Sequence, residues 1–329
     1  MVGETVGKYR MLEAIGRGGV GTVYRARDEE AGRDVAIKVL NTATVDAVQI
    51  RRFETEAVAL SRLAHPGIAR ILDVFEHDRQ RLMVMDLLDG ETLDHMVRAR
   101  GPLLPARAAT LIAQALSTLG DAHKAGIIHR DIKPGNLMLT AGGPLKILDF
   151  GVALVAGAER LTEAGLLVGT PAYMAPEQVT GEPVDARTDV YSMGLVLYYL
   201  VTAKLPFEGR TPALVAQARV TSAPEPARTH IHALPAWIEQ ALARALERQP
   251  ADRFQTADQF RVALEDGIRN NPVKGPGIII SSDAETVAMP VPDFARLPRP
   301  PGPPAAGRTN LLVILAIVVA VIVLLVLVR

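Results

Sequence analysis

The sequence predicts an α+β fold followed by a single membrane-spanning helix. Strand-like runs lie near the start of the 329-residue chain, at Tyr9–Ile15, Val20–Arg27 and Asp34–Leu40. Farther along, apolar residues recur at the three- to four-residue spacing of amphipathic helices. A final apolar run has the length of a membrane span. A chain of this size permits about two domains of ordinary size.

The helices are predicted from their inward stripes. Phe53, Ala57, Leu60 and Ala64 form such a stripe and place a first helix at about Asp46–Leu63. Later helical patterns cover about Ala106–Lys124, Ala186–Thr202, Leu234–Leu246 and Thr256–Asp266. Helices therefore dominate the part of the chain that follows the strands.

The stretch from residue 268 to residue 310 is predicted to be a disordered linker. Nine prolines lie between Gly267 and Asn310, and few large apolar residues occur outside Ile278–Ile280. Such a composition cannot bury a core. A proline-rich ligand for a partner module is the alternative, and a plain spacer next to the membrane is the preferred interpretation.

Residues 311–328 are predicted to form the transmembrane helix. Leu311–Val328 is an uninterrupted apolar run of 18 residues without a charge. As a helix it would extend roughly 27 Å, close to a hydrocarbon core of about 30 Å, and it would contact lipid. A buried soluble helix is the alternative, but such a helix rarely lacks every polar residue over five turns.

The flanking charges predict the orientation of this span. Arg296, Arg299 and Arg308 precede it and only Arg329 follows it, so the positive-inside bias places residues 1–310 in the cytoplasm. The N-terminus has no apolar segment of a signal peptide. We therefore expect a single-pass protein of the cell membrane with nothing of size beyond the span.

The composition excludes several classes of function. The chain has no cysteine, which rules out disulfides, thiolate metal sites and a cysteine nucleophile. Lys and Arg number 36, as do Asp and Glu, so no net basic charge favours nucleic acid as a partner. The 49% hydrophobic content is high for a soluble chain, and the C-terminal run accounts for much of it.

A glycine-rich loop joins the first two predicted strands. Gly16, Gly18 and Gly21 are followed by Val23 in the spacing G-x-G-x-x-G-x-V. Glycines let backbone N–H groups approach phosphate oxygens closely, so the hairpin could fold over a nucleotide. A dinucleotide fingerprint would need a helix next, but Thr22–Tyr24 is strand-like. Alone, the loop is weak evidence, because glycine-rich turns are common.

Two charged residues accompany the loop. Lys38 lies in the strand-like run Val35–Lys38, and Glu56 lies beside the inward stripe of the first helix. A half-buried Glu56 could pair with Lys38 and direct its ammonium toward phosphates. Taken alone, Lys38 could equally be an exposed lysine of an edge strand, and Glu56 could be a solvated helix glutamate.

The segment Ile127–Leu139 decides between these interpretations. It contains His129-Arg130-Asp131, Lys133-Pro134 and Asn136, and Asp149-Phe150-Gly151 follows thirteen residues after Asn136 (149 − 136). This pattern is similar to the catalytic loop and the D-F-G metal motif of the protein kinase superfamily. Further segments that resemble the motifs of the same superfamily follow at Gly169–Glu177, Asp189–Gly194 and Arg253. The resemblance covers roughly residues 8–266, and Lys133-Pro134 resembles the serine/threonine branch.

The resemblance implies a two-lobed, protein-kinase-like α+β fold. A kinase domain is expected at residues 8–267, with ATP between its lobes. The N-lobe, about residues 8–86, would hold an antiparallel sheet and one helix, and the C-lobe, about residues 89–267, would be mainly helical.

The resemblance also implies roles for the motif residues. Asp131 would accept or orient the proton of the acceptor hydroxyl, and Lys133 would stabilise the transferring phosphoryl group. Lys38, held by Glu56, would bind the α- and β-phosphates. Asp149 and Asn136 would bind Mg²⁺, with Mn²⁺ as an alternative ion. The expected ATP-binding residues are Ile15, Gly16, Gly18, Gly21, Val23, Ala36, Lys38, Met85, Asp86, Leu88 and Met138, with Met85 as gatekeeper, residues 86–88 as hinge, and Val23, Ala36 and Met138 around adenine.

Other family positions are expected to be structural. Glu177 and Arg253 would form a buried ion pair, Asp189 would hold the catalytic-loop backbone, and His129 would be packed in the core. The pair His230-x-His232 could suggest a metal, but no third ligand lies nearby in the sequence.

Arg130 directly before Asp131 resembles kinases whose activation segment is ordered by phosphorylation. Thr162 is the predicted phosphosite. Thr170 is the second candidate and ranks below it, because the resemblance places Thr170 where the family uses the hydroxyl to hydrogen-bond the catalytic aspartate and lysine. Leu154 stands where relatives carry a basic residue and Ala164 where they often have a threonine. Dependence on autophosphorylation therefore stays open. Further candidate hydroxyls in the linker are Ser281, Ser282 and Thr286.

The whole pattern resembles bacterial eukaryotic-type transmembrane serine/threonine kinases, here without an external sensor domain. We expect an ATP-dependent enzyme that phosphorylates serine and threonine hydroxyls of proteins and its own activation segment. Side-by-side dimerisation and a partner protein are two open routes to activation. A catalytically silent pseudokinase scaffold is the alternative, which the presence of every required residue disfavours. A transporter is excluded, since one span without polar residues cannot line a pathway.

Overall fold

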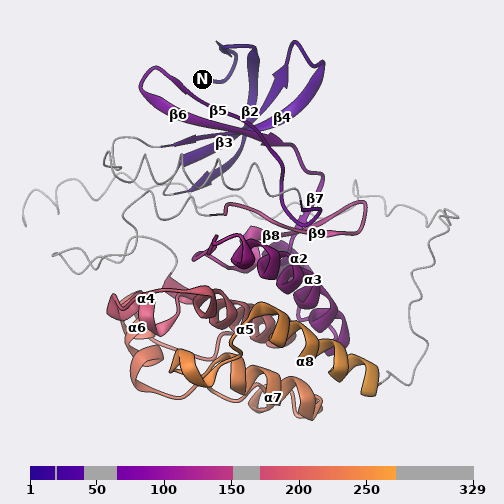
Figure 1. Cartoon of the computed structure of the whole chain (residues 1–329), viewed down its shortest axis with the longest axis vertical. Helices are drawn as coiled ribbons and strands as arrows, with labels where there is room; N and C mark the ends of the chain where they lie inside the picture. Colours follow the sequence, from indigo (N-terminus) through magenta and orange to yellow (C-terminus); the bar gives the residue numbers. More distant parts are fainter. Residues whose placement is uncertain (19–20, 41–64, 151–170, 272–329) are drawn as a thin grey trace, which may run out of the picture. The chain divides into compact units, whose positions relative to one another are not determined.

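The computed structural model describes residues 1–18, 21–40, 65–150 and 171–271. The chain divides into two compact units, Met1–Gly275 and Pro276–Arg329. Every described residue belongs to the first unit, which contains a small, mainly β lobe and a larger, mainly helical lobe (Figure 1).

The small lobe is a six-stranded antiparallel sheet with the strand order β1-β2-β3-β4-β6-β5. Its strands are β1 (Thr5–Val6), β2 (Tyr9–Gly18), β3 (Gly21–Asp28), β4 (Arg33–Leu40), β5 (Ile71–His77) and β6 (Gln80–Asp86). The three predicted strands are confirmed. β2 runs beyond the predicted end at Ile15, because pairing with β3 continues to Gly18 opposite Gly21.

Alternation of side chains explains why this sheet is stable. One face buries a cluster of apolar side chains from five strands, and Tyr9 stacks on Phe75 with ring centroids 5.9 Å apart. The cluster comprises Val6, Tyr9, Met11, Ala26, Val35, Ile37, Val39, Leu82 and Val84. The opposite face of β3 and β4 is therefore left to line the site described below.

The larger lobe begins with a three-stranded sheet of order β7-β8-β9 and continues in helices. Its strands are β7 (Gly90–Thr92), β8 (Leu137–Thr140) and β9 (Leu145–Ile147). Its α-helices are α2 (Leu93–Arg100), α3 (Pro105–Lys124), α4 (Pro176–Thr180), α5 (Ala186–Thr202), α6 (Pro212–Thr221), α7 (Ala236–Ala245) and α8 (Ala257–Asn270). The four helices predicted for this region are confirmed, and α7 begins after Pro235 rather than at Leu234.

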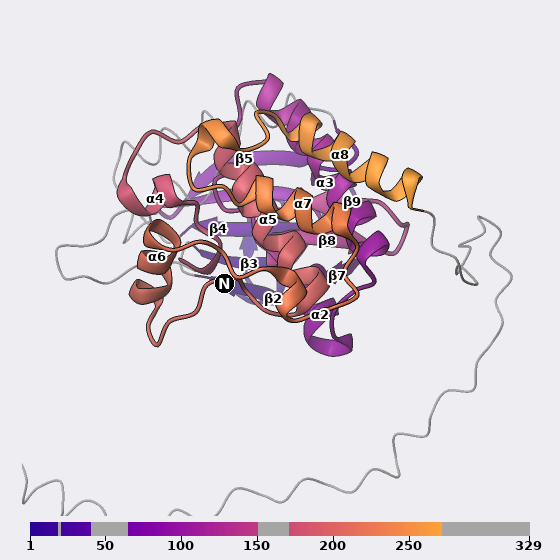
Figure 2. The same cartoon turned by 90° about the horizontal axis from the view of Figure 1, so that it is seen from below.

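Helix α5 is the centre of the large lobe. It contacts α3, α7 and α8, and Figure 2 shows it among them. Nearly all of its side chains are buried, which is typical of a helix that is enclosed on every side. The helix therefore provides a rigid base for the loops at its N-terminal end.

A buried ion pair ties α4 to the end of the lobe, as predicted. Arg253 donates from Nη1 and Nη2 to the two carboxylate oxygens of Glu177, both at 2.8 Å. The hydroxyl of Thr188 donates to the same carboxylate at 2.7 Å. The side chains of Arg253 and Glu177 are only 0% and 2% exposed, so water does not screen the pair.

Close packing of α7 and α8 depends on a glycine. A Cβ atom on Gly267 would lie 2.1 Å from Cε3 of Trp237, a contact that no packed structure tolerates. We expect Gly267→Ala to lower the free energy of unfolding by about 1–3 kcal/mol, against the usual preference of helices for alanine. Denaturant unfolding measures this change. Gly142→Ala is the control, because its Cβ would meet only Pro144 at 3.8 Å; equal stability losses in both variants would contradict the packing argument.

No helix among the described residues is both long and apolar enough to cross a membrane. Helix α8 continues to Asn270, so the predicted start of the disordered linker at residue 268 is wrong, because the amphipathic pattern of α8 extends past Asp266. The rest of the linker beyond residue 271, the predicted span at 311–328 and the predicted helix at Asp46–Leu63 lie outside the described residues.

Candidate active site

A cavity of about 450 Å³ lies between the small and the large lobe. The small lobe contributes residues from β2, β3 and β4, and the large lobe contributes the segment before α2, the loop around β8, and the residues after β9. Its lining residues are Ile15, Gly16, Arg17, Gly21, Val23, Lys38, Thr92, Asp131, Lys133, Gly135, Asn136, Met138, Leu148 and Asp149. Segments far apart in the sequence therefore meet at one cavity.

The β2–β3 hairpin forms the wall of the cavity in the small lobe. Gly16 pairs with Val23, and Gly21 pairs with Leu40 of β4. A Cβ atom on Gly21 would lie 2.2 Å from the carbonyl oxygen of Val39, so only glycine fits where β3 approaches β4. Ile15 also lines the cavity on this wall and is 49% exposed, so its side chain is accessible to a ligand.

An ion pair crosses from the small lobe to the large one. Nζ of Lys38 in β4 lies 2.8 Å from Oδ1 of Asp149, and the Lys38 side chain is only 7% exposed. Burial alone would raise the pKa of Asp149. The charge of Lys38 and its hydrogen bond outweigh burial, so the pKa of Asp149 lies below its ordinary value and the carboxylate is ionised at neutral pH.

The loop before β8 holds a second Asp–Lys pair. Nζ of Lys133 donates to Oδ2 of Asp131 at 2.7 Å. The amide nitrogen of Asn136 donates to the same Oδ2 at 3.1 Å and to the Asp131 carbonyl at 2.8 Å. Neither set of bonds uses Oδ1 of Asp131 or the amide oxygen of Asn136. As far as bonds between described residues go, these two oxygens are therefore left to face a ligand.

Asp189 at the start of α5 holds the backbone of this loop, as predicted. Its Oδ2 accepts from the His129 N–H at 2.8 Å, and its Oδ1 accepts from the Arg130 N–H at 2.7 Å. His123 from α3 is 2.8 Å from Oδ2 and completes the shell. Arg130 has φ of +65°, and the two bonds fix this left-handed conformation, which non-glycine residues rarely adopt.

His129 connects the loop to the residues after β9. Its Nε2 lies 2.9 Å from the carbonyl oxygen of Leu148, and its Nδ1 accepts from the N–H of Asp131 at 3.2 Å. Its ring packs against Phe150 with centroids 4.7 Å apart. Asp149, between Leu148 and Phe150, has φ of +57°. The predicted core role of His129 is confirmed, and the histidine fixes the two loops that carry Asp131 and Asp149.

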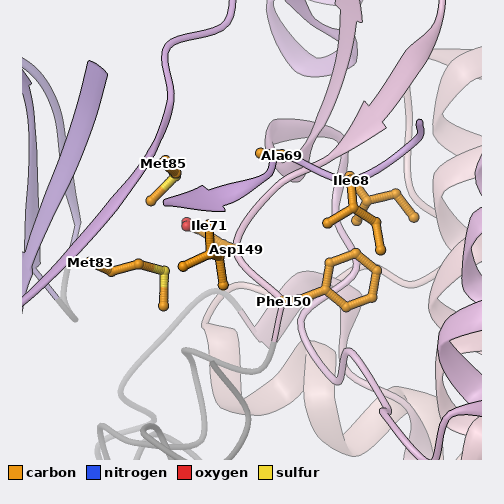
Figure 3. Close-up of a pocket in the computed structure, with 8 residues that line it drawn as sticks. Ile68, Ala69, Ile71, Met83, Met85, Asp149 and Phe150 are labelled. Atoms are coloured by element: carbon orange, nitrogen blue, oxygen red, sulfur yellow. The ribbon is translucent and has the colours of Figure 1, made fainter. Parts of the chain in front are cut away.

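A smaller cavity lies next to Asp149 on the apolar side (Figure 3). Its volume of about 20 Å³ is enough for one water molecule. Met83 and Met85 of β6 line it together with Phe150, and Figure 3 shows the Asp149 carboxyl between the two methionines and the phenyl ring. Ile68, Ala69, Ile71 and Ile147 complete the lining.

Most of the predicted ATP-binding residues line the main cavity, but not all do. Met85 lines the smaller cavity instead. Ala36 is buried in β4 opposite Met85, Asp86 ends β6, and Leu88 is half-buried in the connection to β7. Gly18 pairs with Gly21 at the tip of the hairpin. Ala36, Met85, Asp86 and Leu88 are therefore not among the described residues that line the main cavity.

Three predicted site residues lie outside the described residues: Glu56, Thr162 and Thr170. Within the described part of the chain, the ionic partner of Lys38 is Asp149.

The sequence did not point to Arg17, Thr92, Gly135 and Leu148, which line the same cavity. Thr92 caps α2 by accepting the N–H of His95 at 3.2 Å, so a Thr before a helical pattern was the available signal. Arg17, between Gly16 and Gly18, could have been identified from the loop motif.

The donor set fits a hard divalent cation. The Asp149 carboxylate and the Asn136 amide oxygen are the ligand types that Mg²⁺ prefers, and Mg²⁺ takes few protein ligands because it keeps waters and substrate phosphates. Among the described residues, no cluster of three or more His, Asp or Glu side chains could enclose a metal by itself. His232 is exposed and His230 pairs with Glu225, so no metal site forms there in this part of the structure.

The fold and the site define a class of protein. Two lobes enclose a cavity with a glycine-rich wall, two lysines and two carboxylates, an arrangement suited to a phosphate-bearing nucleotide and its cation.

Comparisons with known proteins place the chain within this class. The model of the protein kinase domain matches residues 9–262. A probable serine/threonine-protein kinase of Corynebacterium efficiens is 36% identical over 309 residues, covering 91% of this chain and 47% of the relative. Serine/threonine-protein kinase PknB of Mycobacterium tuberculosis is 35% identical over 289 residues, covering 86% of this chain and 46% of PknB.

A solved kinase-domain structure has a similar fold. The PknI kinase domain of M. tuberculosis, a C20A_R136A double mutant, superposes with a TM-score of 0.69 at 27% identity, over 81% of this chain and 98% of that one. The chain belongs to the protein kinase domain family, with a domain of the bacterial serine/threonine type. It spans about half the length of the curated relatives that it matches.

Proposed function

We propose that this protein is a membrane-tethered serine/threonine kinase that transfers the γ-phosphoryl group of ATP to protein hydroxyls. The observation that carries this proposal is the convergence of Lys38, Asp131, Lys133, Asn136 and Asp149 on one cavity between two lobes. Phosphoryl transfer needs a cation on the phosphates, metal ligands and a group that orients the nucleophile, and these five side chains supply all three.

Asp131 is the proposed group that orients the acceptor hydroxyl and takes its proton. Lys133 and Asn136 both donate to Oδ2, so Oδ1 is the oxygen that the described residues leave available to a hydroxyl. Lys133 is the proposed contact to the transferring phosphoryl group, because it lines the same cavity beside Asp131.

Lys38 is the proposed contact to the α- and β-phosphates, and Asp149 and Asn136 are the proposed ligands of Mg²⁺. When bound, the cation supplies positive charge that neutralises the phosphates. The Lys38–Asp149 ion pair holds the two side chains together at the cavity, and it lowers the pKa of the Asp149 carboxyl. Glu56 is the proposed second partner of Lys38.

The adenine ring is proposed to lie between the small-lobe wall and β8. Val23 and Met138 line the cavity from opposite lobes, and Ile15 is exposed on the same wall. Ala36 would complete the sandwich, with Met85 as gatekeeper and Asp86 and Leu88 as hinge contacts.

The finer organisation is proposed from the sequence. The kinase domain would extend from residue 8 to the end of α8 at Asn270. The linker would follow up to residue 310, and a lipid-embedded helix 311–328 would keep the domain at the cytoplasmic side of the cell membrane. The uninterrupted apolar run supports this tether. Thr162 is the proposed autophosphorylation site, with Thr170 second, and dimerisation in the membrane is a proposed route to activation. Nothing in the described residues favours the silent scaffold.

One experiment tests these proposals together. We expect the full chain, incubated with Mg²⁺, labelled ATP and casein, to label casein and itself, with the label at Thr162 by mass spectrometry. Lys38→Met and Asp149→Asn should abolish labelling, and extraction with carbonate should leave the wild-type chain in the membrane fraction. Folded wild-type chain that binds ATP without labelling itself or casein would refute the kinase proposal in favour of a scaffold.

A further inference from the structure

The segment 171–178, hereafter the acceptor segment, is bonded directly to the catalytic loop. It comprises the short helix η4 (Pro171–Tyr173) and the first residues of α4. The Gln178 side chain donates to the carbonyl oxygen of Arg130 at 2.8 Å and accepts from the Ala175 N–H at 2.9 Å. Because Arg130 immediately precedes Asp131, the position of this segment is set relative to the proposed base.

The other end of the acceptor segment is held from two helices. The hydroxyl of Ser192 in α5 donates to the carbonyl oxygen of Tyr173 at 2.8 Å. Nη2 of Arg219 in α6 donates to the preceding carbonyl, that of Ala172, at 2.9 Å. Two consecutive carbonyl groups are therefore fixed by side chains from separate elements of the large lobe.

Arg219 is built into the lobe rather than lying on its surface. Its side chain is 1% exposed, and its guanidinium lies 5.5 Å from the centre of the Phe207 ring. Helix α6 packs against both α4 and η4, and the two views of Figures 1 and 2 show α4 and α6 side by side. A hydrogen bond from a buried guanidinium is stronger than a neutral one, and water cannot replace it there.

Arg219 acts on the acceptor segment and not on the nucleotide cavity. Arg219 does not line the nucleotide cavity, and it contacts the acceptor segment through the Ala172 carbonyl. Because Gln178 ties this segment to the residue before Asp131, an acceptor whose hydroxyl reaches Asp131 is expected to bind beside it. A substitution of Arg219 should therefore displace the acceptor segment while leaving the phosphate-binding residues in place.

We propose that Arg219 is a positioning residue that fixes the acceptor segment relative to Asp131 and so determines the affinity for the protein acceptor. The inference rests on the proposed kinase function. An acceptor binds most tightly to a surface that is already held in place, so loss of a single buried anchor of the acceptor segment should weaken acceptor binding measurably.

The test compares acceptor and nucleotide kinetics in the full chain. We expect Arg219→Met to raise the KM for casein roughly tenfold, the effect of losing one charge-assisted hydrogen bond, and to leave the KM for ATP and the acceptor-independent ATP hydrolysis unchanged. Arg219→Lys keeps a charged donor and the aliphatic stem, so we expect a smaller rise. It also serves as the folded variant if methionine lowers the melting temperature.

Arg244→Met is the matched control. Arg244 also lies over a phenylalanine ring, 4.5 Å from the centre of Phe254, but it is exposed on α7 and makes no bond to the acceptor segment. We expect this variant to keep the wild-type KM for casein. A casein KM that is unchanged in both Arg219 variants, or a KM for ATP that rises in parallel with it, would overturn the inference. Wild-type chain that fails to label casein would instead refute the kinase proposal.

Discussion

Asp131→Asn is expected to lower kcat for casein phosphorylation about 10³-fold, because removal of a general base typically costs 10²–10⁴ in rate. Asparagine has the shape of aspartate and can still accept from Lys133 and Asn136, so the loop should keep its conformation. Affinity for ATP should change little, since the proposed phosphate and metal contacts belong to other residues. Steady-state kinetics and binding of a fluorescent ATP analogue measure the two quantities separately.

Asp121→Asn provides the matched control for this change. Asp121 also accepts from a lysine, Lys124 at 3.1 Å, but the pair lies near the end of α3 and outside the cavity. Its variant should retain wild-type kcat. If Asp131→Asn kept more than about one tenth of the wild-type kcat, Asp131 would not be the proton acceptor.

Glu177→Gln is expected to lower the free energy of unfolding by about 3–5 kcal/mol, because it leaves the buried guanidinium of Arg253 without its counter-charge. Chemical denaturation at pH 7 measures the loss. The double variant Glu177→Gln/Arg253→Met should recover part of it, since removing both charges avoids the unpaired one. A double variant less stable than the single one would contradict this explanation.

The same pair predicts how stability depends on pH. Burial would raise the pKa of Glu177, but the hydrogen bond and charge of Arg253 lower it below the ordinary value of 4.5. Since the folded pKa is below the unfolded one, the stabilisation is fully present above about pH 4.5 and is lost as pH falls through the folded pKa. The difference in stability between wild type and Glu177→Gln should therefore shrink as the pH is lowered below that value.

The catalytic loop could be predicted because its residues are close in sequence. Asp131, Lys133 and Asn136 lie within six positions in a pattern that resembles the kinase catalytic loop, and the structure brings them together. The strand that carries Lys38 and the helix α5 that carries Asp189 were also predictable, because each has a clear hydrophobic pattern.

Other features depend on contacts that no local pattern encodes. The pairing of Lys38 with Asp149 joins residues more than one hundred positions apart, and Arg219 resembles any arginine of an amphipathic helix until α6 packs on η4. Strands β5 and β6 were not predicted, since β5 is only half-buried and lacks a regular alternation. Among the predicted nucleotide-binding residues, Val23 and Met138 line the main cavity whereas Met85 lines the smaller one. Only the packing of the side chains determines this division.

The left-handed backbone at Arg130 and Asp149 affects how this protein can evolve or be engineered. Each such conformation costs a non-glycine residue about 1–3 kcal/mol, and glycine would adopt it without this cost. At Asp149, glycine would also remove the carboxylate on which the proposed chemistry depends. Stability and activity are therefore opposed at Asp149, and selection for thermal tolerance alone would favour an inactive chain there.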